Sequence, residues 1–133
     1  MKVLSVEQLI ELHVLVIRQT GGSEGLRDLG RLESAIATQT QTAFGKELYV
    51  TLFEKAAVFI RNIIGDHPFM DGNKRTAMLA GLTFLSINGM IYGAQSGELE
   101  DFAVKVAVDR LSVEEITAWL EEHCTEDFDR KGT

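Results

Sequence analysis

Apolar positions recur along the chain with the period of α-helices, and short joints containing glycine separate the helical stretches. Before the only proline, for example, Phe53, Ala56, Ile60 and Ile64 follow one another at spacings of three or four residues. The pattern predicts helices over about residues 5–20, 31–41, 51–65, 76–88, 102–109 and 112–123. Met90 to Gln95 instead indicates an extended or hairpin segment.

Capping signals support these boundaries. Three helices begin with the spacing of a capping box, in which a hydroxyl and a longer side chain satisfy free amides of the first turn. The pairs are Ser5 with Gln8, Thr51 with Glu54, and Ser112 with Glu115. Glycines are expected to end helices, and Asp28 to cap the second one. The helical assignment therefore rests on capping chemistry as well as on periodicity.

The helix over residues 76–88 is apolar on almost every side, as expected for a helix at the centre of a bundle. Its predicted inward-facing residues are Ala77, Leu79, Ala80, Phe84 and Leu85. An all-α fold follows, in which a small helical bundle packs around this central helix. At 133 residues the chain has room for one domain, expected to cover residues 1–133.

Composition narrows the classes of partner. The net charge of -7 and the isoelectric point near 4.9 argue against broad nucleic-acid binding, which needs a basic face. The sequence has no run of about 18 apolar residues and no signal-peptide core, so we expect a cytoplasmic protein without a membrane partner. The single cysteine, Cys124, cannot form an intramolecular disulfide.

The polar chemistry is concentrated in one stretch, His-Pro-Phe-Met-Asp-Gly-Asn-Lys-Arg, which runs from His67 to Arg75. Pro68 disfavours the α-helical conformation at His67, so the preceding helix should end there and the histidine should lie on a turn. A new helix should then begin, with Asp71 or Asn73 as its cap.

The start of that helix has the properties of a phosphate site. Free amides of Gly72, Asn73 and Lys74 would lie at the positive end of the helix dipole, and Lys74 and Arg75 add two full charges. Asp71 would repel phosphates unless a cation lay between them, and Mg²⁺ is typically held by one or two carboxylates, phosphate oxygens and water. The residues therefore predict a nucleotide with Mg²⁺.

His67 is the candidate catalytic base, because an imidazole can take a proton from an attacking hydroxyl near neutral pH. The other two histidines have simpler interpretations. His13 has no ligand-type neighbour at metal-binding spacing and is predicted to be structural or on the surface, and His123 belongs to a helix end. Phe69 and Met70 are also predicted to be structural, with Phe69 anchored in the core.

These residues resemble the motif of the Fic/Doc family, which in the Fic branch reads His-Pro-Phe-x-Asp/Glu-Gly-Asn-Gly-Arg-x-x-Arg. The matching positions are His67, Pro68, Phe69, Asp71, Gly72, Asn73 and Arg75. Lys74 replaces the second glycine and Met78 replaces the last arginine, which is similar to the Doc (death on curing) branch. The resemblance covers about residues 5–90 and implies a Fic-like helical bundle with the motif loop at the N-terminus of the central helix.

The resemblance to the Doc branch also implies an activity. A lysine at position 74 is expected to turn the nucleotide around, so that the γ-phosphate of ATP passes to a serine or threonine hydroxyl of a translation factor, with elongation factor Tu as the family precedent. The toxin would be restrained by an antitoxin that lays a helix in a hydrophobic groove. The expected roles are base for His67, Mg²⁺ ligand for Asp71, and phosphate binding for Gly72, Asn73, Lys74 and Arg75.

Two alternatives remain open. The same fold could transfer AMP or another nucleotidyl group, as the Fic branch does, although Lys74 and Met78 count against it. A catalytically silent module that only binds a partner is the second alternative, and the nearly complete motif disfavours it. Arg27 and Asp28 also have two interpretations. The resemblance places them where they could align a target peptide, whereas a helix cap at Asp28 and an ion pair between Arg27 and Glu33 explain them equally well.

Overall fold

The computed structural model describes residues 1–93 and 97–127. In this part of the chain there are six α-helices and four short strands. The helices are α1 (Val6–Thr20), α2 (Leu29–Ala37), α3 (Leu52–Asp66), α4 (Asn73–Ile87), α5 (Glu98–Asp109) and α6 (Val113–His123). A 3-10 turn, η1 (Thr38–Thr40), follows α2. The strands are β1 (Thr42–Ala43), β2 (Lys46–Glu47), β3 (Met90–Tyr92) and β4 (Cys124–Glu126).

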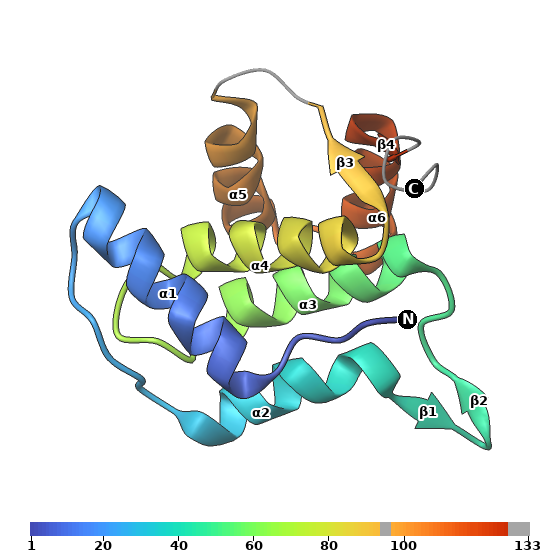
Figure 1. The fold of residues 1–133 in the computed structure, drawn as a ribbon, viewed down its shortest axis with the longest axis horizontal. Helices are drawn as coiled ribbons and strands as arrows, with labels where there is room; N and C mark the ends of the chain where they lie inside the picture. Colours follow the sequence, from blue (N-terminus) through green and yellow to red (C-terminus); the bar gives the residue numbers. More distant parts are fainter. Residues whose placement is uncertain (94–96, 128–133) are drawn as a thin grey trace.

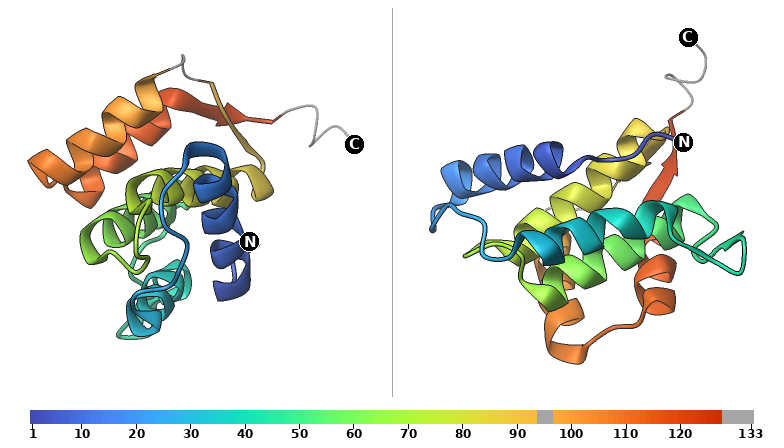
Figure 2. Two further views of the ribbon diagram at one scale, coloured as in Figure 1. Left: turned by 90° about the vertical axis from the view of Figure 1, so that its left-hand side faces the viewer. Right: turned by 90° about the horizontal axis from the view of Figure 1, so that it is seen from below.

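Helices α3 and α4 pack along each other at the centre of the molecule (Figure 1). Helix α1 packs on α4, and α2 packs on α3, while α5 and α6 cover the opposite side of the central pair (Figure 2). The predicted all-α bundle around the helix that follows the motif is therefore confirmed. Among the described residues, the strands form two antiparallel pairs, β1 with β2 and β3 with β4.

The core lies between α3 and α4. The inward residues of α4 include Ala77, Met78, Ala80, Phe84 and Leu85, all buried. Leu79, predicted to point inward, is only partly buried, because Met78 takes the inner position. Gly81 allows the two helices to approach closely, since an added Cβ would lie 2.5 Å from Cδ1 of Ile60.

Most helix ends follow the predicted capping chemistry. Ser5 and Ser112 form complete capping boxes. Asp28 caps α2 by accepting a hydrogen bond from the Arg31 amide at 3.1 Å. Thr51 caps α3, although the Glu54 side chain turns to the Thr51 hydroxyl at 3.3 Å instead of completing the box. Local sequence therefore determined these starts, because each cap is made within one turn.

Three predicted ranges differ from the structure. Helix α4 begins at Asn73, three residues before the predicted start, because Gly72 is its N-cap. Helix α5 begins at Glu98, four residues before Phe102. The prediction missed this first turn because it is acidic and carries little apolar periodicity. Acidic residues there are favourable at the positive end of the helix dipole. Helix α2 begins at Leu29 and ends at Ala37, and the chain then tightens into η1 instead of continuing as an α-helix to residue 41.

The β1–β2 hairpin was not predicted. Its tip, Phe44-Gly45, has positive φ at both residues, whereas the familiar sequences for such turns are Asn-Gly and Asp-Gly. Lys55 of α3 anchors the hairpin and the residues after it, because its ammonium group donates to Glu47 Oε1 at 3.1 Å and to the Tyr49 carbonyl at 2.6 Å. The Lys55 side chain is buried, so this contact joins the hairpin to the core.

The predicted extended segment is confirmed over β3, which pairs with β4 at the far end of the chain. Gly93 follows the strand and its amide donates to the His123 carbonyl at 2.8 Å, whereas Ala94 and Gln95 lie outside the described residues. Cys124 in β4 is buried, and this burial raises the pKa of its thiol to about 11. Within residues 1–93 and 97–127, every helix is too short or too polar to cross a lipid bilayer.

Candidate active site

His67 ends α3 in the left-handed conformation, with φ 50° and ψ 62°. The predicted turn before Pro68 is therefore confirmed. The imidazole is exposed, and its Nδ1 lies 3.2 Å from the carbonyl oxygen of Gly65. Because a carbonyl only accepts hydrogen bonds, Nδ1 is the donor in this contact, and in the neutral imidazole the lone pair therefore lies on Nε2.

Two arginines hold the C-terminal end of α3. Arg27 Nε donates to the His67 carbonyl at 2.7 Å and its Nη2 donates to the Asp66 carbonyl at 2.8 Å. Arg31 Nη1 donates to the same Asp66 carbonyl at 2.7 Å. Cations are favourable at the negative end of a helix dipole, so both arginines stabilise the turn that presents His67. The predicted pairing of Arg27 with Glu33 is wrong. A role for Arg27 and Asp28 in aligning a target peptide stays a prediction.

Residues 21–28 run across the motif loop, and we call them the covering segment. The Arg27 amide donates to the Pro68 carbonyl at 2.7 Å, and the Met70 amide donates to the Gly25 carbonyl at 3.0 Å. An isolated antiparallel bridge joins Leu26 to the loop between these bonds. The motif loop is therefore held by backbone hydrogen bonds to a segment about 40 residues away in sequence.

His13 holds the loop from the opposite side. Its ring is buried and stacked on Phe69, with centroids 4.0 Å apart and planes 4° from parallel. Its Nε2 donates to the Asp71 carbonyl at 2.9 Å. The structural interpretation of His13 and the core position of Phe69 are confirmed, whereas Met70 is 60% exposed and is not a core residue. His13 lies four residues after Leu9, on the same buried face of α1. A buried imidazole needs a hydrogen-bond partner, so this spacing in the sequence could have predicted a buried contact for His13.

Asn73 stabilises the loop with its side chain. Its Oδ1 accepts from the Phe69 amide and its Nδ2 donates to the Phe69 carbonyl, both at 3.0 Å. The predicted capping of α4 by Asp71 or Asn73 is wrong, because Gly72 occupies the N-cap position with φ 71° and no side chain caps the helix. Asn73 is the first residue of α4, and its amide group faces inward toward the loop. Only its backbone N–H remains for an anion.

Asp71 carries a carboxylate at the surface of this loop. Its Oδ2 accepts from the Ser23 amide at 3.1 Å and its Oδ1 accepts from the Gly72 amide at 2.8 Å. These two hydrogen bonds hold the pKa of Asp71 below its ordinary value of 3.8, and the bond from Ser23 has the larger effect. Gly22 makes the close approach possible, since an added Cβ would lie 2.5 Å from Oδ2. An exposed, ionised carboxylate suits Mg²⁺, which prefers oxygen ligands.

A hollow of about 290 Å³ lies at the N-terminus of α4, and we call it the phosphate hollow. It is lined by Asp71, Gly72, Asn73, Lys74, Arg75, Glu100, Ala103 and Val104. The first backbone bond of α4 runs from the Thr76 amide to the Gly72 carbonyl, so the amides of the three residues between them lack intrahelical partners. Lys74 and Arg75 are exposed at its rim. Glu100 could not be expected there from its position in the chain, because it comes from α5.

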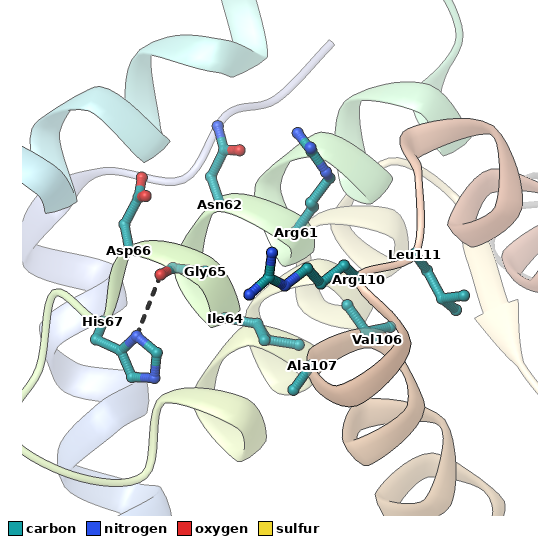
Figure 3. A pocket seen from close by; sticks show the side chains of 10 residues that line it. All are labelled: Arg61, Asn62, Ile64, Gly65, Asp66, His67, Val106, Ala107, Arg110 and Leu111. Atoms are coloured by element: carbon teal, nitrogen blue, oxygen red, sulfur yellow. Dashed lines mark hydrogen bonds between the residues drawn. The ribbon is translucent and has the colours of Figure 1, made fainter.

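His67 lines a second hollow, of about 470 Å³, between the C-terminal ends of α3 and α5 (Figure 3). We call it the histidine hollow. Val106 and Ala107 of α5 line it, whereas Ala103 and Val104, one turn earlier, line the phosphate hollow. The structure therefore brings the predicted phosphate-binding residues together with Asp71 in one hollow. The predicted base, His67, lines a different hollow, and α5 contributes lining residues to both.

The motif loop, the covering segment and the whole of α1 fall within the range that matches a known family. The model of the Fic/DOC family matches residues 3–85. The chain therefore belongs to the Fic/DOC family, as its motif predicts.

Two relatives are similar over most of their length. The chain is 38% identical over 120 residues to the protein kinase doc of Escherichia phage P1, covering 90% of this chain and 94% of that protein. It is 37% identical over 102 residues to the toxin Doc of Mycolicibacterium smegmatis, covering 75% of this chain and 78% of the toxin. Both relatives are Doc proteins, in agreement with the branch that Lys74 indicates.

Proposed function

We propose that this chain is a Doc-like toxin that transfers the γ-phosphate of ATP to a serine or threonine hydroxyl of a translation factor in the cytoplasm. The observation that supports this proposal most directly is the orientation of the His67 imidazole. Its Nδ1 donates to the Gly65 carbonyl, so in the neutral imidazole the lone pair of Nε2 is available to a hydroxyl in the histidine hollow. A base in this state can take a proton without first losing one.

The bonds and protons of the proposed transfer balance as follows. The acceptor oxygen forms a bond to the γ-phosphorus as the bond from that phosphorus to the bridging oxygen of ADP breaks. The acceptor proton goes to Nε2 of His67, and ADP leaves with the electron pair of the broken bond. The imidazolium then returns its proton to solvent, which restores the enzyme. Catalysis of this kind depends mainly on positioning and on stabilising the phosphate charge.

The phosphate hollow supplies that stabilisation in this proposal. The backbone amides of Asn73, Lys74 and Arg75 and the two side-chain cations would bind the phosphates, as at other helix N-termini. Asp71 would hold Mg²⁺, which neutralises phosphate charge when bound. The fit rests on the exposed Asp71 carboxylate, whose pKa is lowered by hydrogen bonds from the Ser23 and Gly72 amides.

Two observations favour γ-phosphate transfer over nucleotidyl transfer. Lys74 occupies the position of the glycine that the Fic branch uses for close approach to phosphates. Met78, at the position of the second Fic arginine, is buried in the core and offers no cation to the hollow. The name of the phage relative, protein kinase doc, points in the same direction.

In this proposal an antitoxin helix would bind beside the phosphate hollow. A hollow of about 190 Å³ lies between α1, α4 and α5, with Val16, Met78, Leu79 and Leu99 among its lining residues. Polar side chains surround this apolar floor, as in grooves that accept amphipathic helices. Arg75 lines both this groove and the phosphate hollow, so a helix bound here would lie next to the nucleotide.

The test uses ATP labelled in parallel at the γ or the α phosphate, with Mg²⁺, a bacterial lysate and the purified protein. We expect label from γ alone on one protein, and a loss of at least about 100-fold in His67→Ala because a general base is removed. His123→Ala is the matched control, since that imidazole lies in α6 and should not affect transfer.

The other outcomes are equally informative. Transfer retained by folded His67→Ala would remove His67 from its role as base. Label from the α phosphate would assign the chain to nucleotidyl transfer, and no label from either phosphate would favour the silent binding module.

A further inference from the structure

The histidine hollow contains two arginines that the proposed reaction does not use. Arg61 of α3 and Arg110 at the end of α5 line it together with His67. In Figure 3 the Arg110 side chain extends from α5 across the hollow toward the last turn of α3. Among the described residues, neither guanidinium has a hydrogen bond or an ion pair with another side chain.

Other arginines at this end of the molecule are already engaged. Arg27 and Arg31 donate to the backbone carbonyls that end α3, and Arg31 also pairs with Asp28 at 3.3 Å. The C-terminal dipole of α3 is therefore satisfied without Arg61 or Arg110. Helix capping does not account for the two free guanidinium groups.

The backbone of Arg110 supplies a second observation. It has φ 50° and ψ 55°, the left-handed conformation, in which glycine is the favoured residue at a helix end. A side chain kept in a sparsely populated conformation at a site points to a role for that side chain. Here the conformation lets an arginine project from the end of α5 over the hollow.

The arrangement of the two hollows determines which reactant meets these arginines. The nucleotide phosphates belong at the N-terminus of α4, where the free amides and Lys74 lie. The acceptor hydroxyl must reach His67, so the protein substrate enters the histidine hollow. The segment around the acceptor residue therefore passes Arg61 and Arg110.

Charge determines what kind of segment fits. Among the residues that line the histidine hollow, Asp66 provides a carboxylate and is outnumbered by two guanidinium groups. The rest of the chain is acidic, with a net charge of -7, and repels acidic peptides. Guanidinium groups bind carboxylates through charge-assisted and often bidentate hydrogen bonds.

We infer that Arg61 and Arg110 bind an acidic side chain of the protein substrate next to the hydroxyl that His67 deprotonates. This inference rests on the proposed function, because it assigns the histidine hollow to the acceptor. It makes the two arginines specificity-determining residues for acidic sequences around the modified serine or threonine.

The probe is a short fluorescein-labelled peptide with one threonine between glutamates, compared with the same peptide carrying glutamines. Fluorescence anisotropy should show the glutamate peptide binding about tenfold more tightly to the wild-type protein, as charge-assisted pairs allow. The Arg61→Gln/Arg110→Gln protein should lose this preference. Arg18→Gln/Lys46→Gln, with the same change in net charge at exposed positions on α1 and β2, should keep it.

A second readout locates the binding. The imidazole signals of His67, assigned by their loss in His67→Ala, should shift in NMR spectra when the glutamate peptide is added to the wild-type protein. They should not shift with the glutamine peptide. Circular dichroism on both double variants confirms that each is folded.

Each result has one meaning. Equal affinity of the wild-type protein for the two peptides, or a preference that persists in Arg61→Gln/Arg110→Gln, overturns the inference. So does weaker binding of Mg²⁺ and ATP to that variant, because the arginines would then hold the nucleotide. The labelled-ATP assay is separate: if it fails while the peptide preference holds, the proposed kinase fails and the acidic-peptide site stands.

Discussion

The three histidines show how environment determines the role of one residue type. His13 is buried, stacked on Phe69 and hydrogen-bonded to the Asp71 carbonyl, so its imidazole is a structural donor. His67 is exposed, and within the described part of the chain its imidazole is hydrogen-bonded through Nδ1 alone. His123 stacks on Trp119 and lies near Glu98. Chain position alone distinguished His67, because only His67 precedes a proline and a cationic helix start.

Asn73 provides a prediction at this scale. Asn73→Ala should lower the free energy of unfolding by about 1–3 kcal/mol, because the Phe69 amide and carbonyl would lose their buried partners. Urea denaturation followed by circular dichroism measures this change. Lys74→Ala, at the exposed neighbouring position, should change stability by less than about 0.5 kcal/mol. Equal losses in both variants would show that the Asn73 contacts do not stabilise the loop.

Among the structural elements, the covering segment has the largest effect on the site. It has no helix or strand of its own, yet its amides reach the Pro68 carbonyl and the Asp71 carboxylate. Gly21 and Gly22 both have positive φ, which lets the chain leave α1 and turn over the loop. The segment therefore lowers the pKa of Asp71 and also holds the loop in position.

The glycine pair offers a matched test. Both Gly22→Ala and Gly21→Ala place a side chain at positive φ, but only the new Cβ at position 22 meets the Asp71 carboxylate. Gly22→Ala should break the Ser23 hydrogen bond and raise the pKa of Asp71 toward 3.8, whereas Gly21→Ala should leave the pKa low. An NMR titration of the Asp71 carboxyl carbon measures both values.

The sign of the associated stability change follows. A carboxyl whose pKa is lowered by folding stabilises the folded state above its ordinary pKa, and this contribution disappears as the pH falls through the lowered value. Gly22→Ala should therefore reduce the dependence of stability on pH below about pH 4, relative to Gly21→Ala. An unchanged Asp71 pKa in Gly22→Ala would show that Ser23 does not control the carboxylate.

At the scale of the whole molecule, the packing of α3 on α4 fixes the position of the histidine hollow relative to the phosphate hollow. Helix α3 ends at His67 and α4 begins beside Asp71, so both site segments are carried by the central pair. The helices meet where Gly81 lies against Ile60. A shift of one helix against the other would separate the base from the phosphate hollow.

Gly81→Ala tests this packing. The added methyl group would overlap the Ile60 side chain and should destabilise the protein by about 1–3 kcal/mol, a typical result of overpacking. Gly65→Ala is the control, because its Cβ meets no atom within 4 Å and alanine restricts the unfolded chain. Thermal denaturation should show a lower midpoint for Gly81→Ala and an equal or higher one for Gly65→Ala. Similar midpoints would mean that the two helices can move apart without cost.

The sequence by itself determined most helix boundaries, the central position of α4, the turn at His67 and the cationic start of α4. These features depend on interactions within about one helical turn: caps at Ser5, Asp28 and Ser112, and the restriction that Pro68 places on its neighbour. The motif also identified the family, because its residues are contiguous in the chain.

Only the tertiary structure decided how the remaining polar groups are used. His13 binds the Asp71 carbonyl 58 residues away, and Arg27 binds the His67 carbonyl 40 residues away. Asn73 could have capped α4 or faced a phosphate, and the buried backbone of the loop determined that it faces Phe69. The two hollows likewise depend on where α5 packs. Buried polar groups must find partners wherever the fold brings them, and the local sequence does not contain that information.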